Sequence, residues 1–107
     1  MTNTSLDITP QQAHLDATDG SAVIVDVREP WEWEAGSAAG ALRISLHELP
    51  SRLDDVPRDR RVHCICASGN RSRMAAEFLR DRGFDATSVS GGTAAWMLHR
   101  LPAERGA

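Results

Sequence analysis

The sequence contains no lysine and only two cysteines, Cys64 and Cys66, among its 107 residues. All 12 basic residues are arginines scattered along the chain, and the formal net charge is -3. Without a basic run, a general nucleic-acid-binding surface is not expected. Two cysteines separated by one residue are too close for an ordinary stabilising disulfide. A disulfide scaffold is therefore excluded, and free thiol chemistry in a reducing compartment is favoured.

The sequence also lacks any long hydrophobic run. No stretch approaches the roughly 20 apolar residues that span a bilayer, and residues 1–7 have neither the basic nor the apolar part of a secretory signal. We therefore expect a soluble cytoplasmic protein with no membrane contact. A composition of 41% hydrophobic and 25% charged residues is typical of globular proteins. The length predicts a single domain over residues 1–107, with its core at about 6–102.

Short apolar segments alternate with helical patterns along the chain. Strands are predicted at residues 6–8, 22–25, 42–44, 62–66 and 86–89. Helices are predicted from residue 10, over 30–33, after residue 45, before residue 83 and over 93–99. The second strand is continuously apolar, which is typical of a parallel sheet covered on both faces. This order predicts an α/β fold with a central, mainly parallel five-stranded sheet flanked by helices.

Several residues mark the ends of these helices. Capping boxes are predicted at residues 9–12 and 45–48, and Thr93 is expected to cap the last helix. Gly83 is expected to end the helix that precedes it, in a Schellman-type turn. The apolar face of that helix is predicted to consist of Met74, Ala75, Phe78 and Leu79. Residues 36–40 are expected to form a flexible connection.

Cys66 lies where chemistry is expected in such a fold. It ends a predicted strand, and ligands of open α/β sheets bind beyond the carboxyl ends of the strands. A short loop and a helix start follow, whose backbone N–H groups stabilise negative charge and lower the pKa of a thiol. Gly69 suits the tight curl of such a loop. Cys66 is therefore a candidate nucleophile, whereas Cys64, in mid-strand, is expected in the core, with a role as resolving thiol as the alternative.

Four segments of the sequence have a distinctive order and spacing. They are Asp26-Val27-Arg28-Glu29-Pro30, residues 36–41, Cys66-Ala67-Ser68-Gly69-Asn70-Arg71-Ser72, and Gly91-Gly92 with Trp96. In this order they resemble the single-domain rhodaneses, a family of sulfurtransferases. The resemblance covers nearly the whole chain. One departure is at Ser37 and Ala38, where many relatives have a histidine and a bulky apolar residue.

The resemblance implies a persulfide cycle. Cys66 would take a sulfane sulfur from a small anionic donor such as thiosulfate, and would pass it to a nucleophilic acceptor. The substrate-binding residues would be the loop residues Ala67, Ser68, Gly69, Asn70, Arg71 and Ser72, with Arg43 near the rim of the pocket. Arg71 would either orient the donor or fix the loop to a carboxylate.

Other residues are expected to support the site or to bind partners. Asp26 and Arg28 are predicted to form an ion pair that supports the pocket. Trp31 and Trp33 cannot both face the core, so one of them is a candidate anchor for a protein partner. No metal is predicted, because the histidines and the Cys-x-Cys pair lack ligand spacing, and no cofactor is expected. We expect a monomer, with a protein as a further possible sulfur donor or acceptor.

Two other functions remain open at this point. One is a thiolate phosphatase or arsenate reductase of the same fold, and the other is a partner-binding module without catalysis. The resemblance argues against the first, because those relatives have a longer loop than the four residues between Cys66 and Arg71. An intact Cys66, Gly69 and Arg71 argue against the second, because a module without chemistry does not need a polarised thiol.

Overall fold

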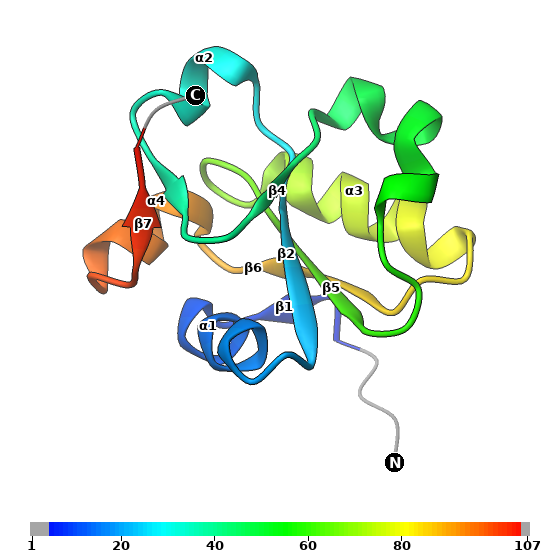
Figure 1. Cartoon of the computed structure of the whole chain (residues 1–107), viewed down its shortest axis with the longest axis horizontal. Helices are drawn as coiled ribbons and strands as arrows, with labels where there is room; N and C mark the ends of the chain where they lie inside the picture. The colour runs from blue at the N-terminus through cyan, green and yellow to red at the C-terminus, as the bar shows by residue number, and fades with distance from the viewer. Residues whose placement is uncertain (1–4, 106–107) are drawn as a thin grey trace.

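The computed structural model describes residues 5–105, and its centre is a five-stranded sheet in which all strands run parallel (Figure 1). In spatial order the strands are β1 (Asp7–Ile8), β6 (Ala86–Val89), β5 (Arg61–Ile65), β2 (Ala22–Asp26) and β4 (Leu42–Arg43). The predicted fold class is confirmed. Residues 1–4 and 106–107 lie outside the described residues, and the expectation about a secretory signal rests largely on the first of these segments.

Helices cover both faces of the sheet (Figure 1). They are α1 (Pro10–Thr18), α2 (Pro30–Trp33), the 3-10 helix η1 (Leu46–Asp55), α3 (Asn70–Asp81) and α4 (Gly92–Leu98). On one face, α3 and η1 cover a core that includes Leu49 and Leu79. On the other face, α1 and α4 cover a second core that includes Ala13 and Trp96. No helix within residues 5–105 is long and apolar enough to cross a membrane.

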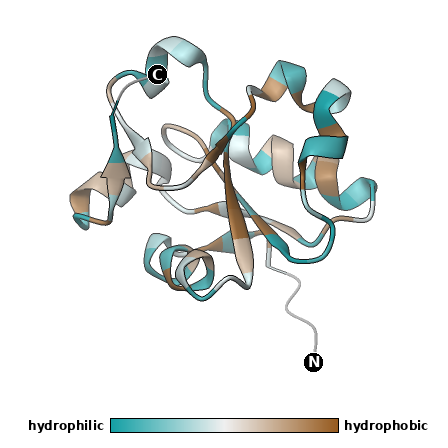
Figure 2. Ribbon diagram, viewed as in Figure 1, coloured by the Kyte–Doolittle hydropathy of each residue, from teal (hydrophilic) through white to brown (hydrophobic). Residues whose placement is uncertain are grey.

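The central strands are mostly buried, and β2 is drawn largely in the hydrophobic colour in Figure 2. Along β5, Val62 and Cys64 belong to the core under α3, whereas Ile65 belongs to the core under α1 and α4. This alternation follows from the two-residue period of a strand. Each fully buried Val or Ile side chain stabilises the fold by about 1.5–3 kcal/mol.

A second, two-stranded sheet was not predicted. β3 (Ser37–Ala38) pairs antiparallel with β7 (Ala103–Glu104), and Gly40 N donates to the Glu104 carboxylate at 2.7 Å. The expectation of a flexible connection at residues 36–40 is therefore wrong. Strands of two residues are too short to produce a periodic pattern, and their partner is distant in the sequence.

The predicted helix ends are partly confirmed. Thr9 caps α1 by accepting a hydrogen bond from Gln12 N at 3.1 Å, but the Gln12 side chain donates to Asp16, so the capping box is incomplete. Ser45 makes no capping hydrogen bond to η1. Gly83, with φ +89, ends α3 as expected.

Two predictions about helices are wrong. Thr93 does not cap α4, since the cap is Gly91 with a left-handed backbone, and Thr93 lies inside the helix. Met74 does not join the core face of α3, because it is 59% exposed, whereas Ala75 and Leu79 are buried. The helical period alone places Met74 at the edge of the apolar face, and the sheet covers only the centre of that face.

Candidate active site

Three strands end side by side at the carboxyl edge of the sheet. The parallel register pairs Asp26, at the end of β2, with both Arg43 on β4 and Ile65 on β5. Cys66 directly follows Ile65, so Asp26, Arg43 and Cys66 lie at the ends of three adjacent strands. This edge is where open α/β sheets bind ligands.

The loop between β5 and α3 curls around the sulfur of Cys66. Gly69 N donates to Cys66 Sγ at 3.1 Å, and Ser72 Oγ lies 3.4 Å from the same sulfur. Gly69 has φ +118, a backbone conformation that side chains rarely adopt, and it is also the N-cap of α3. The tight curl of the loop therefore depends on glycine at position 69. The curl directs the start of α3 toward the sulfur.

The surroundings of the two cysteines give them opposite acidities. Burial raises the pKa of the Cys66 thiol, but hydrogen bonds from the Ser72 hydroxyl and from the N–H groups of Ser72, Gly69 and Ser68 outweigh it, so the pKa is lowered. Burial, together with the nearby Cys66 charge, raises the pKa of Cys64 to about 12. The thiolate of Cys66 is thus favoured relative to that of an ordinary cysteine, whereas Cys64 is a buried core thiol, which argues against the resolving role.

The start of α4 holds the loop by donating hydrogen bonds to its carbonyl groups. Thr93 N and Thr93 Oγ1 donate to the carbonyl oxygen of Cys66 at 2.7 and 3.1 Å, and Ala94 N donates to that of Ala67 at 3.2 Å. N–H and C=O point in opposite directions across a peptide. Because α4 holds these two carbonyl groups, the N–H groups of the same peptides are free to face the sulfur. Sequence reasoning did not assign Thr93 or Gly92 to the site, although the Gly91-Gly92 pair was the available signal.

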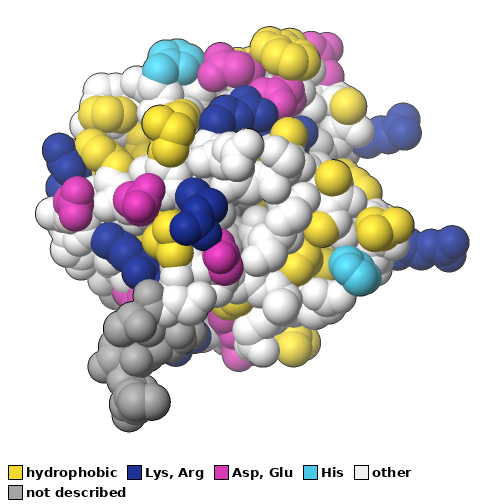
Figure 3. Space-filling model, turned by 180° about the vertical axis from the view of Figure 1, so that it is seen from behind, with side chains coloured by type: hydrophobic (Ala, Val, Ile, Leu, Met, Phe, Trp, Pro, Cys, Tyr) yellow, Lys and Arg dark blue, Asp and Glu magenta, His cyan; other side chains and the backbone are white. Residues whose placement is uncertain are grey.

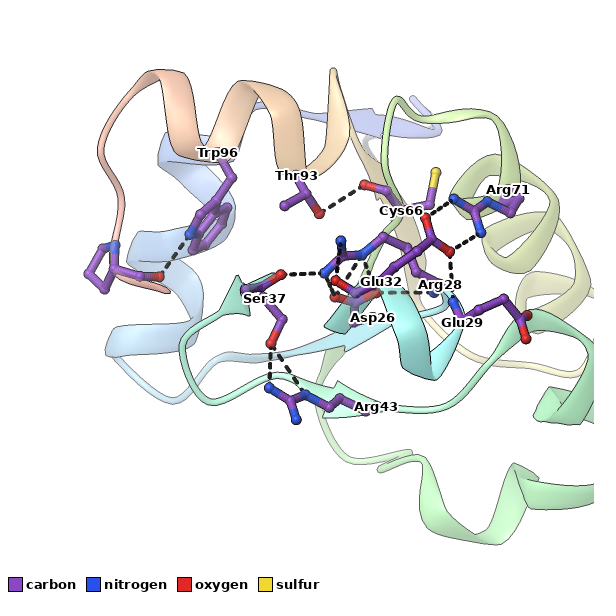
Figure 4. A network of polar contacts seen from close by, with 12 residues as sticks. Asp26, Arg28, Glu29, Glu32, Ser37, Arg43, Cys66, Arg71, Thr93 and Trp96 are labelled. Carbon is purple, nitrogen blue, oxygen red and sulfur yellow. Dashed lines mark hydrogen bonds and ion pairs between the residues drawn. The ribbon is translucent and has the colours of Figure 1, made fainter. Parts of the chain in front are cut away.

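Arg71 is fixed to α2 by a two-pronged ion pair (Figure 4). Its two terminal nitrogens lie 2.7 and 2.8 Å from the carboxylate oxygens of Glu32. The hydrogen bonds from Arg71 lower the pKa of Glu32 to about 2, and Glu32 in turn raises the pKa of Arg71. Glu32 also accepts from Glu29 N at 2.8 Å, which closes the capping box of α2. The ion pair therefore joins Arg71, at the start of α3, to a carboxylate on α2.

A buried ion pair holds α2 in place. The Asp26 carboxylate, which is fully buried, accepts from Arg28 Nε and from Arg28 N at 3.0 Å and lies 2.8 Å from a terminal nitrogen of Arg28. Arg28 also donates to the Gly36 carbonyl at 2.7 Å (Figure 4). This pair thus joins the end of β2 to both ends of the α2 segment, and α2 carries the carboxylate that fixes Arg71.

The remaining predicted residues lie around this centre. Arg43 donates to Ser37 Oγ at 2.8 Å, which directs it toward β3 (Figure 4), and its guanidinium carbon lies 5.9 Å from the centre of the Trp33 ring. Ala67 is half-buried, whereas Ser68 and Asn70 are exposed at the rim of the loop. Within residues 5–105, no group of three His, Cys, Asp or Glu side chains is arranged to hold a metal ion.

The fold and the site define an α/β protein with a polarised cysteine in a strand–loop–helix cradle. The sequence matches the family described as rhodanese-like domain over residues 9–99. The chain therefore belongs to the rhodanese-like domain family. Over 81 residues it is 37% identical to a sulfurtransferase of Allochromatium vinosum, a match that covers 75% of this chain and 76% of the relative.

Solved structures agree with this assignment. A rhodanese-related protein from Thermoplasma volcanium superposes with a TM-score of 0.86 at 32% identity, covering 94% of this chain and 98% of that one. A protein of unknown function from Rhodopseudomonas palustris, described as a possible tyrosine phosphatase, superposes with a TM-score of 0.83 at 28% identity. That match covers 94% of this chain and 86% of the other. The chain is thus similar to proteins of more than one described activity.

Proposed function

We propose that this protein is a sulfurtransferase that moves a sulfane sulfur from a donor to an acceptor through a persulfide on Cys66. The observation that carries the proposal is the cradle itself, in which N–H groups and the Ser72 hydroxyl surround one sulfur atom and favour its thiolate. A cradle of this size stabilises a single negatively charged sulfur, because fixed donors stabilise charge only where they point.

The reaction divides one transfer into two displacements. In the first, the Cys66 thiolate attacks the outer sulfur of thiosulfate, the sulfur–sulfur bond of the donor breaks, and sulfite leaves with the electron pair. In the second, a nucleophile such as cyanide or a thiolate attacks the outer sulfur of the persulfide, and the Cys66 thiolate leaves. Gly69 N and the Ser72 hydroxyl stabilise the anion at each stage.

The position of Arg71 supports sulfur transfer over phosphate transfer. Both terminal nitrogens of Arg71 are directed at Glu32, so the guanidinium holds the loop rather than facing a tetrahedral oxyanion inside it. Only four residues separate Cys66 from Arg71, which keeps the loop around the sulfur small. The thiolate phosphatase or arsenate reductase stays the second candidate, and the similarity to a possible tyrosine phosphatase is the observation that favours it.

The proposal extends to partners and location. A small anionic donor such as thiosulfate fits a cradle of backbone N–H groups, and a protein persulfide or thiol is a further donor or acceptor. A function that needs a free thiolate on Cys66 suits the reducing cytoplasm.

Sulfur transfer from thiosulfate to cyanide tests the proposal directly. Cys66→Ser is expected to abolish the transfer, because a hydroxyl cannot form a persulfide, and the matched variant Cys64→Ser is expected to keep substantial activity. Mass spectrometry of the protein treated with thiosulfate without reductant should show one added sulfur atom, which is absent from Cys66→Ser.

An equal loss in the two variants would contradict Cys66 as the sole carrier. Hydrolysis of an aryl phosphate by the wild type, without any added sulfur on Cys66, would instead support the phosphatase. Absence of both activities in the folded protein would favour a binding module.

A further inference from the structure

Two large hydrophobic side chains are exposed on the helices that flank the Cys66 loop. Trp31 on α2 is 71% exposed, and Met74 on α3 is 59% exposed. Trp31 directly precedes Glu32, and Met74 follows Arg71 by three residues, which places it next to Arg71 on the helix surface. The ion pair between Glu32 and Arg71 therefore joins the two helices that carry these exposed side chains.

Trp31 is exposed on a rigid support. Pro30 occupies the first turn of α2, and the capping box between Glu29 and Glu32 closes that turn. Glu32 is then held by Arg71. A tryptophan held in this way presents a large contact area and loses little conformational entropy on binding, which is the property of an interface anchor. Packing of the hydrophobic cores does not explain a tryptophan at this position, because Trp31 is outside both cores.

Two further carboxylates, Glu29 and Glu34, lie close to Trp31 in the sequence and carry negative charge to this surface. Glu29 is half-exposed and lies 3.3 Å from His47, and Glu34 is exposed and makes no ion pair with any residue in the described range 5–105. Figure 3 shows acidic and hydrophobic side chains side by side along the upper edge of the molecule, where α2 lies, with a histidine and a basic side chain next to them. A partner for this surface therefore needs positive charge and an apolar contact.

Exposed residues of the loop lie beside the buried side chain of Cys66. Cys66 is 1% exposed, and the rim next to it consists of the exposed residues Ser68 and Asn70. The outer sulfur of a persulfide extends about 2 Å beyond Sγ. A protein thiol that attacks this sulfur has to lie on a segment that protrudes from its own protein, and such a segment can also contact α2.

We propose that Trp31, Glu29 and Glu34 form a docking surface for a protein segment whose reacting cysteine is flanked by basic and apolar residues. The inference rests on the proposed function, because that cysteine is the acceptor of the sulfane sulfur. Its thiolate attacks the outer sulfur of the Cys66 persulfide, the S–S bond breaks, and Cys66 leaves as a thiolate. The products are an acceptor persulfide and free enzyme, so no oxidant or reductant is consumed.

Two synthetic acceptor peptides of equal length test the proposal. In one, the cysteine is flanked by arginine and leucine, and in the other each arginine is replaced by glutamate. The full chain is loaded with thiosulfate, and kcat/KM is measured for each peptide and for cyanide. The variants are Trp31→Ala and Glu34→Gln, and the matched control is Leu98→Ala, which removes a side chain 78% exposed near the far end of α4.

We expect the wild type to prefer the basic peptide, and the preference to fall as salt is added. Trp31→Ala should lower kcat/KM for the basic peptide at least about fivefold, the loss typical of an interface anchor, while cyanide transfer and Leu98→Ala stay at the wild-type level. Glu34→Gln should reduce the preference between the two peptides.

Equal rates for the two peptides, or a Trp31→Ala loss that is the same with cyanide, would overturn the docking surface and leave the proposed function intact. Absence of transfer to cyanide by the wild type would overturn the proposed function, and the docking surface with it.

Discussion

Gly92 lies directly against the main chain of Cys66, so a β-carbon at position 92 would collide with the Cys66 carbonyl oxygen. The same β-carbon would lie 2.6 Å from the carbonyl oxygen of Ala67. Those two carbonyls also accept hydrogen bonds from Thr93 N and Ala94 N. The curvature of the loop and the start of α4 therefore form one structural unit.

Gly92→Ala should damage catalysis more than folding. The added methyl group must push the Cys66 carbonyl away, which misdirects the N–H groups that surround the sulfur. A misplacement of about 1 Å is expected to lower the rate about a hundredfold, measured as thiosulfate:cyanide transfer. The matched control is Gly40→Ala, which has a similar left-handed backbone at φ +76 but no atom within 4 Å of the new β-carbon. Equal activity of the two variants would contradict the support role of α4.

Ser72→Ala should raise the pKa of Cys66. The hydroxyl is one of the groups that lower this pKa, and a hydrogen bond to a charged group is worth about 1.5–3 kcal/mol, or roughly one to two pH units. Because the thiolate loses a donor, the midpoint of iodoacetamide alkylation against pH should move upward. Ser68→Ala is the control, since Ser68 contributes through its backbone N–H, and its midpoint should not change.

Glu32 and Arg71 are expected to act as one unit. Glu32→Gln and Arg71→Gln should each lower kcat, because each releases the loop from α2. If Arg71 acts only through Glu32, the double variant loses no more activity than Arg71→Gln alone, and KM for thiosulfate stays constant. Losses that multiply, together with a raised KM in Arg71→Gln only, would show that Arg71 binds the donor directly.

His63 should make stability depend on pH. It is fully buried between Asp16 and Thr87, with Nε2 2.8 Å from the Asp16 carboxylate and Nδ1 2.5 Å from Thr87 Oγ1. Burial lowers its pKa from the ordinary 6.5, outweighing Asp16, which raises it. The unfolded chain therefore binds a proton below pH 6.5 that the folded chain does not.

The unfolding free energy should consequently fall as pH drops below 6.5, by up to about 1.4 kcal/mol per pH unit, until the folded pKa of His63 is reached. Urea denaturation at a series of pH values measures this slope. His63→Gln should remove it, whereas His99→Gln, at an exposed position, should retain it. An identical slope in both variants would contradict the assignment to His63.

Local patterns predicted the elements of the fold with few errors. The continuously apolar run of β2 and the alternation of strands and helices identified the parallel sheet, because a doubly covered strand has to be apolar on both sides. The errors occurred where local signals are weak or compete. Thr93 is a good cap residue, yet Gly91 provides the left-handed cap of α4, and the Thr93 hydroxyl bonds to Cys66 instead.

By itself the sequence determined the order of the elements, the position of Cys66 after a central strand, and the short loop with Gly69 at its turn, since these depend on neighbouring residues. The tertiary structure alone decided that Glu32 receives Arg71, that α4 supports the loop, and that β3 pairs with β7. These contacts join residues far apart in the chain. Their geometry follows from the packing of α2 and α4 at the carboxyl edge of the sheet, which no local period or motif encodes.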